Sequence, residues 1–210
     1  APRTAGAFYL AIIILGLSAE LVLRAQFLRP DAETTAQLVA AAGHALPLAI
    51  VADTLMLAAD VVVAVLLYQI LKPAGATLAL AAMIFRLMQA ALIGGKIMFD
   101  LSALLTYRAG GDIVSAHHDL MLAAVGYDLG LIFFGVNSLI TAVLVIRLAG
   151  LPALLGYGLG AAGVVYLAGA YLRILAPALY DAFAPAYAIT ILAELAFALW
   201  LLIRGVREPA

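Results

Sequence analysis

The sequence contains no cysteine and little charge for its length. Its 210 residues include 12 Asp and Glu and 11 Lys and Arg, so charged residues make up 11% of the chain, against roughly 25% in soluble domains. The absence of cysteine excludes disulfides, thiolate metal sites, iron–sulfur clusters and a cysteine nucleophile. With a formal net charge of -1 and no cluster of Lys and Arg, the chain offers no basic surface for nucleic acid or anionic lipid.

Apolar residues take the place of the missing charge. They make up 67% of the sequence, and the mean hydropathy is +1.17. A membrane-spanning helix needs about 20 mostly apolar residues, and six stretches qualify: 4–24, 47–71, 76–105, 121–147, 151–173 and 183–204. The sequence therefore predicts an all-α integral membrane protein, a compact bundle of six transmembrane helices with short interfacial helices. We expect residues 1–210 to form a single transmembrane domain.

Two polar connections are expected to start helices. Asp31 or Thr34 can cap a short amphipathic helix that lies along the membrane interface. Asp112 can cap the helix that leads into the fourth span. Because the number of spans is even, both termini should lie on the same side of the membrane.

The distribution of Lys and Arg predicts which side that is. Five basic residues fall on the side of the termini and four on the other: Arg3, Lys72, Arg147, Arg204 and Arg207 against Arg24, Arg29, Arg108 and Arg173. Basic residues in short turns carry the most weight in orientation, and Lys72 and Arg147 lie in such turns. We therefore expect cytoplasmic termini.

The third span is unusual because it carries polar side chains where a bilayer helix should be apolar. It contains Arg86, Gln89, Lys96 and Asp100, and an intramembrane charge costs roughly 2.5–3.5 kcal/mol on insertion scales. Gln89, Lys96 and Asp100 follow one another at steps of seven and four, which places them on one helix face. This helix should turn a polar face toward the inside of the bundle.

Polar residues of the other spans should meet that face at two depths. We predict a central layer and an outer layer, with the central layer formed by Asp60, Arg86 and Glu194 and the outer one by Glu20, Asp53, Lys96, Asp100 and Asp128. With Gln89, these residues are our candidate cavity or binding residues. In these two layers six acids face two bases, and such an excess is not stable in a low dielectric when all groups are ionised. Three arrangements would remove this excess: some acids are protonated, Arg24, Arg173 and water reach the acids from the outer interface, or a cation is bound.

Other candidate features carry weaker signals. His117 and His118 could contribute to a zinc site, but no spaced metal motif accompanies them. Gly156 and Gly160 form a small-xxx-small pair that favours close helix packing, either within the chain or in a homodimer. The Tyr and Trp residues are mostly interpreted as membrane-interface anchors.

Several segments together resemble a known family. They are Ala5-Gly6, Ala19-Glu20, Leu66-Leu67-Tyr68, Leu71-Lys72-Pro73, Phe85-Arg86-Leu87, Gln89-Ala90, residues 126–135 around Asp128, Leu151-Pro152, Leu155-Gly156, Glu194 and residues 199–202. The chain resembles, over nearly its whole length, a family of small bacterial multi-pass membrane proteins catalogued only as a domain of unknown function. The resemblance implies a helical domain in a bacterial inner membrane and brings no activity, cofactor or catalytic residue. Lys96 departs from the pattern of that family.

The residues leave three functional hypotheses open. The leading one is a charged intramembrane cavity that binds or moves a small polar or cationic solute, with coupling to protons as an option. The first alternative is an accessory or structural subunit of a larger membrane complex. The second is an intramembrane metal-dependent hydrolase. The charged network can also be purely structural. The sequence favours a protein without enzymatic activity and identifies no catalytic residue, and we predict no cofactor and no nucleic-acid partner.

Overall fold

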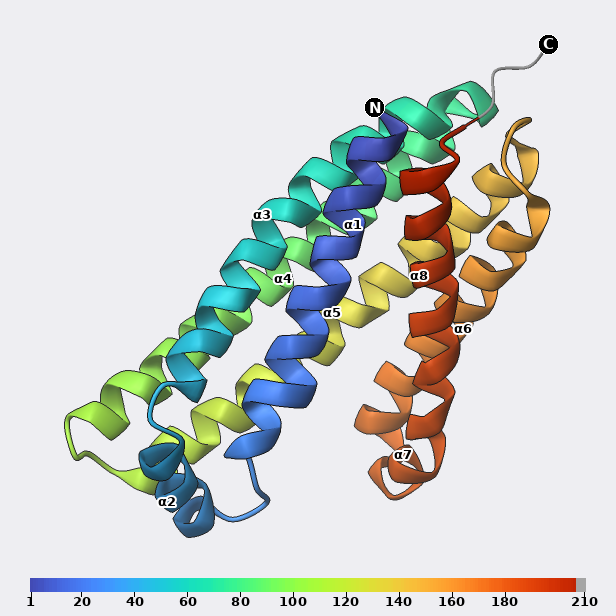
Figure 1. Cartoon of the computed structure of the whole chain (residues 1–210). Coiled ribbons are helices and arrows are strands. Elements are labelled where there is room, and N and C mark those ends of the chain that lie inside the picture. Colours follow the sequence, from blue (N-terminus) through green and yellow to red (C-terminus); the bar gives the residue numbers. More distant parts are fainter. Residues whose placement is uncertain (207–210) are drawn as a thin grey trace.

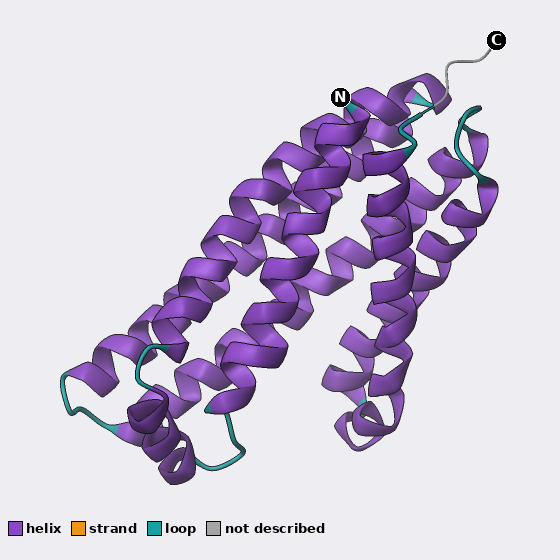
Figure 2. Ribbon diagram, in the orientation of Figure 1, coloured by secondary structure: helices purple, strands orange, loops and turns teal. Residues whose placement is uncertain are grey.

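The computed structural model of the chain describes residues 1–206 and is almost entirely helical. Arg207, which we counted among the basic residues near the termini, lies outside the described residues. Figure 2 shows that the loops are confined to the two ends of the bundle. The long helices are α1 (Pro2–Leu17), α3 (Ala45–Leu71), α4 (Ala76–Arg108), α5 (Ile113–Arg147), α6 (Ala153–Leu175) and α8 (Tyr187–Ile203). The short elements are η1 (Ser18–Leu23), η2 (Arg24–Gln26), α2 (Ala32–Ala42), η3 (Lys72–Ala74), α7 (Pro177–Phe183) and η4 (Ala184–Ala186).

Six of the helical segments in residues 1–206 are long and apolar enough to cross a membrane, which confirms the predicted class of fold. The first continues from α1 through the π-helical η1 and the 3₁₀ turn η2, and the last runs from α7 through η4 into α8. The start of α1 and the end of α8 lie at the same end of the bundle in Figure 1. We call this end the terminal side. The opposite end, which carries α2, α7 and the turn between α4 and α5, is the distal side.

The two predicted helix caps are present on the distal side. The Asp31 carboxylate accepts a hydrogen bond from the Thr34 backbone N–H at 2.7 Å, and α2 begins at the next residue. This bond holds the pKa of Asp31 below its usual value, because the ionised carboxylate is the better acceptor. Asp112 accepts from the N–H groups of Val114 and Ser115 at the start of α5. The caps satisfy N–H groups that a helix start would otherwise leave without a partner.

The long helices form a ring in which each contacts its two neighbours. The order around the ring is α1, α3, α4, α5, α6, α8 and back to α1. On the terminal side, buried apolar side chains from all six helices close the ring, including Val63, Leu67, Leu144, Phe197 and Leu201. On the distal side a smaller apolar cluster joins α3, α4 and α5 to the α2 region, and it includes no residue of α6 or α8. The ring is therefore sealed fully at one end and only in part at the other.

Glycines permit the closest helix contacts. A methyl group at Gly6 of α1 would lie 2.7 Å from the backbone oxygen of Ala198 in α8. A methyl group at Gly156 of α6 would lie 2.8 Å from the Ala142 oxygen in α5, and one at Gly160 would touch the Ala142 side chain at 3.6 Å. The predicted small-residue pair of α6 is thus used within the chain, against α5.

Replacement of Gly6 by Ala should separate α1 from α8, because the added methyl group meets backbone atoms that cannot rotate away. We expect Gly6→Ala to destabilise the protein by about 1–3 kcal/mol, the usual cost of overpacking. The measurement is thermal unfolding in a non-ionic detergent. Gly95→Ala is the matched control, since a methyl group at Gly95 has no atom within 4 Å. Equal unfolding temperatures for the two variants would show that α1 and α8 do not depend on this contact.

Candidate functional site

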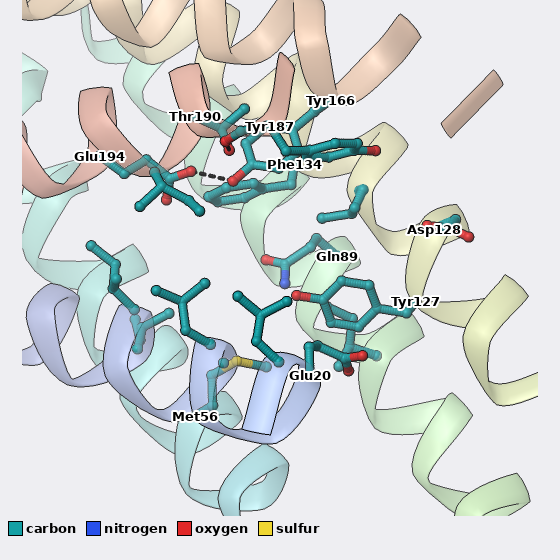
Figure 3. Close-up of a pocket in the computed structure, with 18 of the residues that line it drawn as sticks. Glu20, Met56, Gln89, Tyr127, Asp128, Phe134, Tyr166, Tyr187, Thr190 and Glu194 are labelled. Carbon is teal, nitrogen blue, oxygen red and sulfur yellow. Dashed lines mark hydrogen bonds between the residues drawn. The ribbon is translucent and has the colours of Figure 1, made fainter. Parts of the chain in front are cut away.

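The six-helix ring encloses a cavity of about 400 Å³ that every long helix helps to line. Sites for small molecules commonly have volumes of about 300–1,000 Å³. Figure 3 shows polar side chains of several helices around this cavity, with the Glu194 carboxylate reaching the Tyr166 hydroxyl. Arg86, Asp60 and Glu194 form its polar floor at mid-depth, and we use the term "cavity floor" for these three residues.

The Arg86 side chain is paired with Asp60, as the helical spacing predicted. Arg86 Nε donates to Asp60 Oδ1 at 2.7 Å, and Nη2 lies 2.5 Å from the same oxygen, off the direction of its N–H bonds. With its amide nitrogen directed at the neighbouring acceptors, Gln89 donates a hydrogen bond to Asp60 Oδ2 at 2.8 Å. The guanidinium also lies over the rings of Tyr9 at 4.7 Å and Phe134 at 5.1 Å. Arg86 and Asp60 are 2% and 3% exposed, so one charge compensates the other with almost no help from solvent.

Glu194 is surrounded by tyrosines rather than by a base. Tyr9 donates to its Oε2 at 3.1 Å and Tyr166 donates to its Oε1. Glu194 is 6% exposed and lines the cavity. Among residues 1–206, no Lys or Arg forms an ion pair with it. Both carboxylate oxygens therefore accept hydrogen bonds, and Arg86, the base of the cavity floor, is paired with Asp60 instead.

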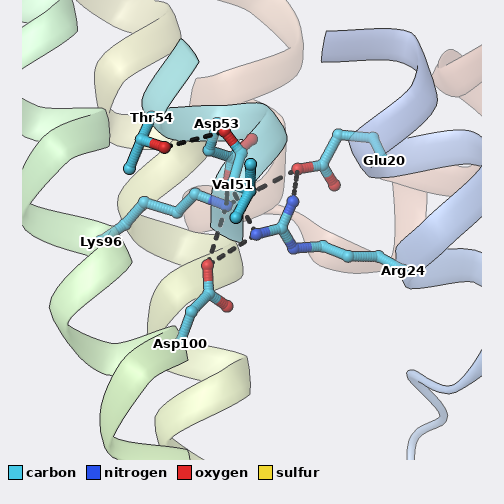
Figure 4. A network of polar contacts seen from close by, with 7 residues as sticks. All are labelled: Glu20, Arg24, Val51, Asp53, Thr54, Lys96 and Asp100. Carbon is cyan, nitrogen blue, oxygen red and sulfur yellow. Dashed lines mark hydrogen bonds and ion pairs between the residues drawn. The ribbon is translucent and has the colours of Figure 1, made fainter. Parts of the chain in front are cut away.

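A second polar cluster, which we call the distal cluster, lies toward the distal side and is shown in Figure 4. Arg24 binds Glu20 at 2.9 Å, Asp53 at 2.7 Å and Asp100 at 2.6 Å. Lys96 approaches the same three acids, at 3.7, 2.9 and 3.3 Å respectively. The cluster ties η1 and η2 to α3 and α4. Glu20 also lines the cavity, so the cluster forms part of its wall.

The local geometry of the first span helps to place this cluster. Glu20 lies in the π-helical η1, and Arg24 follows it by four residues at the start of η2. Residues four apart share a helix face, so the two side chains point together toward α3 and α4. Short π-helical turns are rare and occur frequently at functional sites.

Asp128, also a predicted member of the outer layer, is held separately from this cluster. Its Oδ2 lies 2.9 Å from Arg173 Nε, as an ion pair without a well-directed hydrogen bond. Arg173 extends from α6 over the ring of Tyr180, at 5.2 Å. Both partners line the cavity, where they form its distal rim together with Tyr127 and Tyr180.

The charge balance follows from these contacts. The six predicted acids are compensated by four bases rather than two, because Arg24 and Arg173 join Arg86 and Lys96. The distal cluster holds three acids and two bases, and the cavity floor holds two acids and one base. Each therefore keeps one excess negative charge when all groups are ionised. Low dielectric makes such an excess costly unless a proton or cation compensates it.

Sequence reasoning missed the tyrosines and the central position of Arg24. The interpretation of the tyrosines as interface anchors is wrong for Tyr9 and Tyr166, which bind Glu194 in the interior. The spacing of seven between Tyr187 and Glu194 was a usable signal, since both line the cavity. For Tyr166 the signal was weak, because its role depends on how α6 is rotated relative to α8. Arg24 was expected only to reach the acids from the membrane interface, yet it is 6% exposed.

The histidines lie apart from the cavity. His117 Nε2 lies 2.9 Å from the backbone oxygen of Arg29, a contact that joins α5 to the segment before α2. His118 is exposed at the distal side. Within residues 1–206, no group of three or more His, Asp or Glu residues is arranged to hold a metal ion.

Comparison with known proteins agrees with the resemblance inferred from the sequence. A family model described as a domain of unknown function, DUF4386, matches residues 4–205. No curated protein and no solved structure matches the chain. The family description states no activity, so any functional argument depends on the residues of this chain.

The Arg86–Asp60 pair offers a test of how its buried charges are compensated. Removing one partner leaves an uncompensated buried charge, which typically costs about 3–5 kcal/mol, whereas removing both leaves none. We expect Arg86→Met and Asp60→Leu each to lower the unfolding temperature more than the double variant does. Thermal unfolding of the three variants in detergent completes a double-mutant cycle. Additive losses would contradict direct charge pairing between α4 and α3.

Proposed function

The chain belongs to the family described as a domain of unknown function, DUF4386, and we propose that it binds a small cationic solute within the membrane and moves it across. The observation that carries this proposal is Glu194. It is a buried carboxylate on the cavity wall that accepts two phenolic hydrogen bonds and has no basic partner among the described residues. Intramembrane charges of this kind commonly mark substrate or ion pathways.

The surroundings of Glu194 suit a cation. The cavity floor keeps one excess negative charge, because Arg86 is already paired with Asp60. The rings of Tyr9 and Phe134 face the Arg86 guanidinium, and Tyr166, which meets Phe134 edge to face, lines the cavity beside Glu194. Aromatic faces together with a carboxylate form the usual recognition site for organic ammonium groups. A proton is the smallest cation that can compensate Glu194, so proton coupling belongs to the same proposal.

The asymmetry of the bundle supports movement in addition to binding. The cavity extends toward the distal side as far as Tyr180 and Ala184, while the terminal side is sealed by packed apolar residues. Beyond Arg86 toward the terminal side lies a space of about 10 Å³, lined by Asn137 and Thr141 among others. Such a space has room for about one water molecule. In this arrangement, Arg86 lies between the cavity and this small space, whose other lining residues are mostly apolar.

The alternatives find less support in the contacts. The accessory-subunit hypothesis drew on the glycine-rich span, whose Gly156 packs against α5 inside the chain. The hydrolase hypothesis drew on His117 and His118, which lie outside the cavity lining.

For the membrane orientation we propose that the terminal side is cytoplasmic, in a bacterial inner membrane. The turns at Lys72 and Arg147 on that side are short and basic. The cavity then opens toward the periplasmic side.

Because the chain has no native cysteine, single cysteines can test this orientation without background labelling. Lys72→Cys on the terminal side and Glu33→Cys on the distal side replace exposed residues. A thiol reagent that cannot cross membranes should label Glu33→Cys in whole cells and Lys72→Cys only after the membrane is opened. Labelling in the reverse order would place the termini outside.

Cation binding at Glu194 should be measurable as stabilisation. A ligand present at 100 times its Kd raises the free energy of unfolding by about 2.7 kcal/mol. We expect tetramethylammonium to raise the unfolding temperature of the purified protein in detergent, at constant ionic strength against Na⁺. Glu194→Gln should abolish the effect, because it removes the excess charge but keeps the side-chain shape. Glu33→Gln, which neutralises an exposed acid of α2, is the control and should leave the effect intact.

If tetramethylammonium and the other organic cations tested leave the wild-type unfolding temperature unchanged, the cation-binding proposal fails. It also fails if these cations stabilise Glu194→Gln as much as they stabilise the wild type.

A further inference from the structure

Helices α1 and α8 are in contact on the terminal side and spread apart toward the distal side. Near the termini, Gly6 packs on the backbone of α8, and the rings of Tyr9 and Phe197 meet edge to face with centroids 6.0 Å apart. Farther along, Leu17 of α1 and Ile191 of α8 both line the cavity. Figure 1 shows the two helices, α1 in blue and α8 in red, diverging in this direction. Leu17 and Ile191 are both partly exposed although they line the cavity, as a side opening between α1 and α8 in the distal half of the span would make them.

The distal cluster explains why α1 leans away from α8. Arg24 and Glu20, at the distal end of the first span, are bound to Asp53 of α3 and Asp100 and Lys96 of α4. No comparable contact links this end of the first span to α7 or α8 among the described residues. These ion pairs hold the distal end of the first span against α3 and α4 rather than against α8.

The walls of this opening differ in chemistry from the cavity floor. Side chains on both sides of it are aliphatic, namely Ile12, Ile13, Leu17, Leu21 and Ile191, with Met56, Ile93 and Leu131 deeper inside. Leu21 is 65% exposed at the edge of the cavity. Polar groups lie at the floor, with Glu194 and the Arg86–Asp60 pair, and at the distal rim, with Glu20 and the Asp128–Arg173 pair. The wall between α1 and α8 is therefore aliphatic, whereas the floor beneath it is anionic.

We propose that the solute is an amphipathic monovalent cation that enters sideways from the distal leaflet, with its ammonium group at Glu194 and its hydrocarbon tail between α1 and α8. This inference rests on the proposed cation site and adds the class of solute and the route. A small hydrophilic cation would leave the aliphatic walls against water, which is unfavourable. An amphipathic anion would meet the excess negative charge of the floor. A neutral apolar molecule would leave the Glu194 charge uncompensated.

A series of alkyltrimethylammonium ions tests the class of solute. The probes are tetramethylammonium and its butyl, hexyl and octyl homologues, with octyl sulfonate as a probe of equal tail and opposite charge. Binding to the purified full chain in a maltoside detergent is measured by thermal shift, at free concentrations below micelle formation. Each methylene that enters the cavity should tighten binding about fourfold, from about 0.8 kcal/mol per buried CH₂. Octyl sulfonate should not stabilise the protein.

A matched pair of substitutions tests the route. Ile191→Trp places a large ring in the opening, whereas Leu192→Trp adds the same ring at a neighbouring position that is 67% exposed and outside the cavity lining. Ile191→Trp should remove the dependence of affinity on tail length while tetramethylammonium still binds, and Leu192→Trp should behave as the wild type. If Ile191→Trp does not fold, Leu17→Trp gives the same test from the α1 side.

The outcomes separate this inference from the function on which it rests. Equal affinity for tetramethylammonium and its octyl homologue overturns the amphipathic class and leaves the cation site standing. Tail-length dependence that survives in Ile191→Trp, or in its replacement Leu17→Trp, overturns the route between α1 and α8. Octyl sulfonate binding as tightly as octyltrimethylammonium overturns the selection for cations. The absence of binding by every cation refutes the proposed function itself.

Discussion

Uncompensated charge is costly in hydrocarbon, and this constraint decides how several of the helices face one another. Each of the buried bases Arg24, Arg86 and Lys96 lies within ion-pair distance of at least one carboxylate from another helix. Because each pair joins two spans, it fixes the rotation and the depth of both at once. The hydrophobic effect cannot do this in a bilayer, since lipid tails are as apolar as the side chains. Close contacts at glycines then complete the ring that the ion pairs have oriented.

The two polar centres satisfy this constraint in different ways, and the difference gives the cavity its position. The distal cluster joins the first span to α3 and α4, whereas the phenol of Tyr9 and the packing of Gly6 join it to α8. These attachments lie at opposite ends of the same span. The first span therefore diverges from α8 toward the distal side. The cavity that Glu194 lines lies between the two helices. The position of the cavity follows from where these contacts attach.

Hydropathy and helical spacing predicted the spans, the caps at Asp31 and Asp112, and the pairing of Arg86 with Asp60, because each depends on one helix or on depth alone. Neither hydropathy nor helical spacing predicted that Tyr9 and Tyr166 bind Glu194. Whether a tyrosine such as Tyr166 points to lipid or inward depends on the rotation of its helix, which is set by several neighbours together. The cavity likewise depends on the angle between α1 and α8, and no residue pattern in either helix encodes that angle by itself.

Asp60 and Glu194 are stabilised in different ways, Asp60 by an ion pair and Glu194 by hydrogen bonds from two tyrosines. Arg86 neutralises Asp60 permanently, and the pair then serves mainly to hold α3 and α4 in register. Tyr9 and Tyr166 instead supply hydrogen bonds to Glu194 without adding positive charge. The carboxylate is thus oriented and partly solvated by the protein, yet its charge stays available to whatever enters the cavity. An acid that is paired with a base, such as Asp60, has no free charge for a ligand, whereas the hydrogen-bonded carboxylate of Glu194 is the arrangement that the proposed cation site needs.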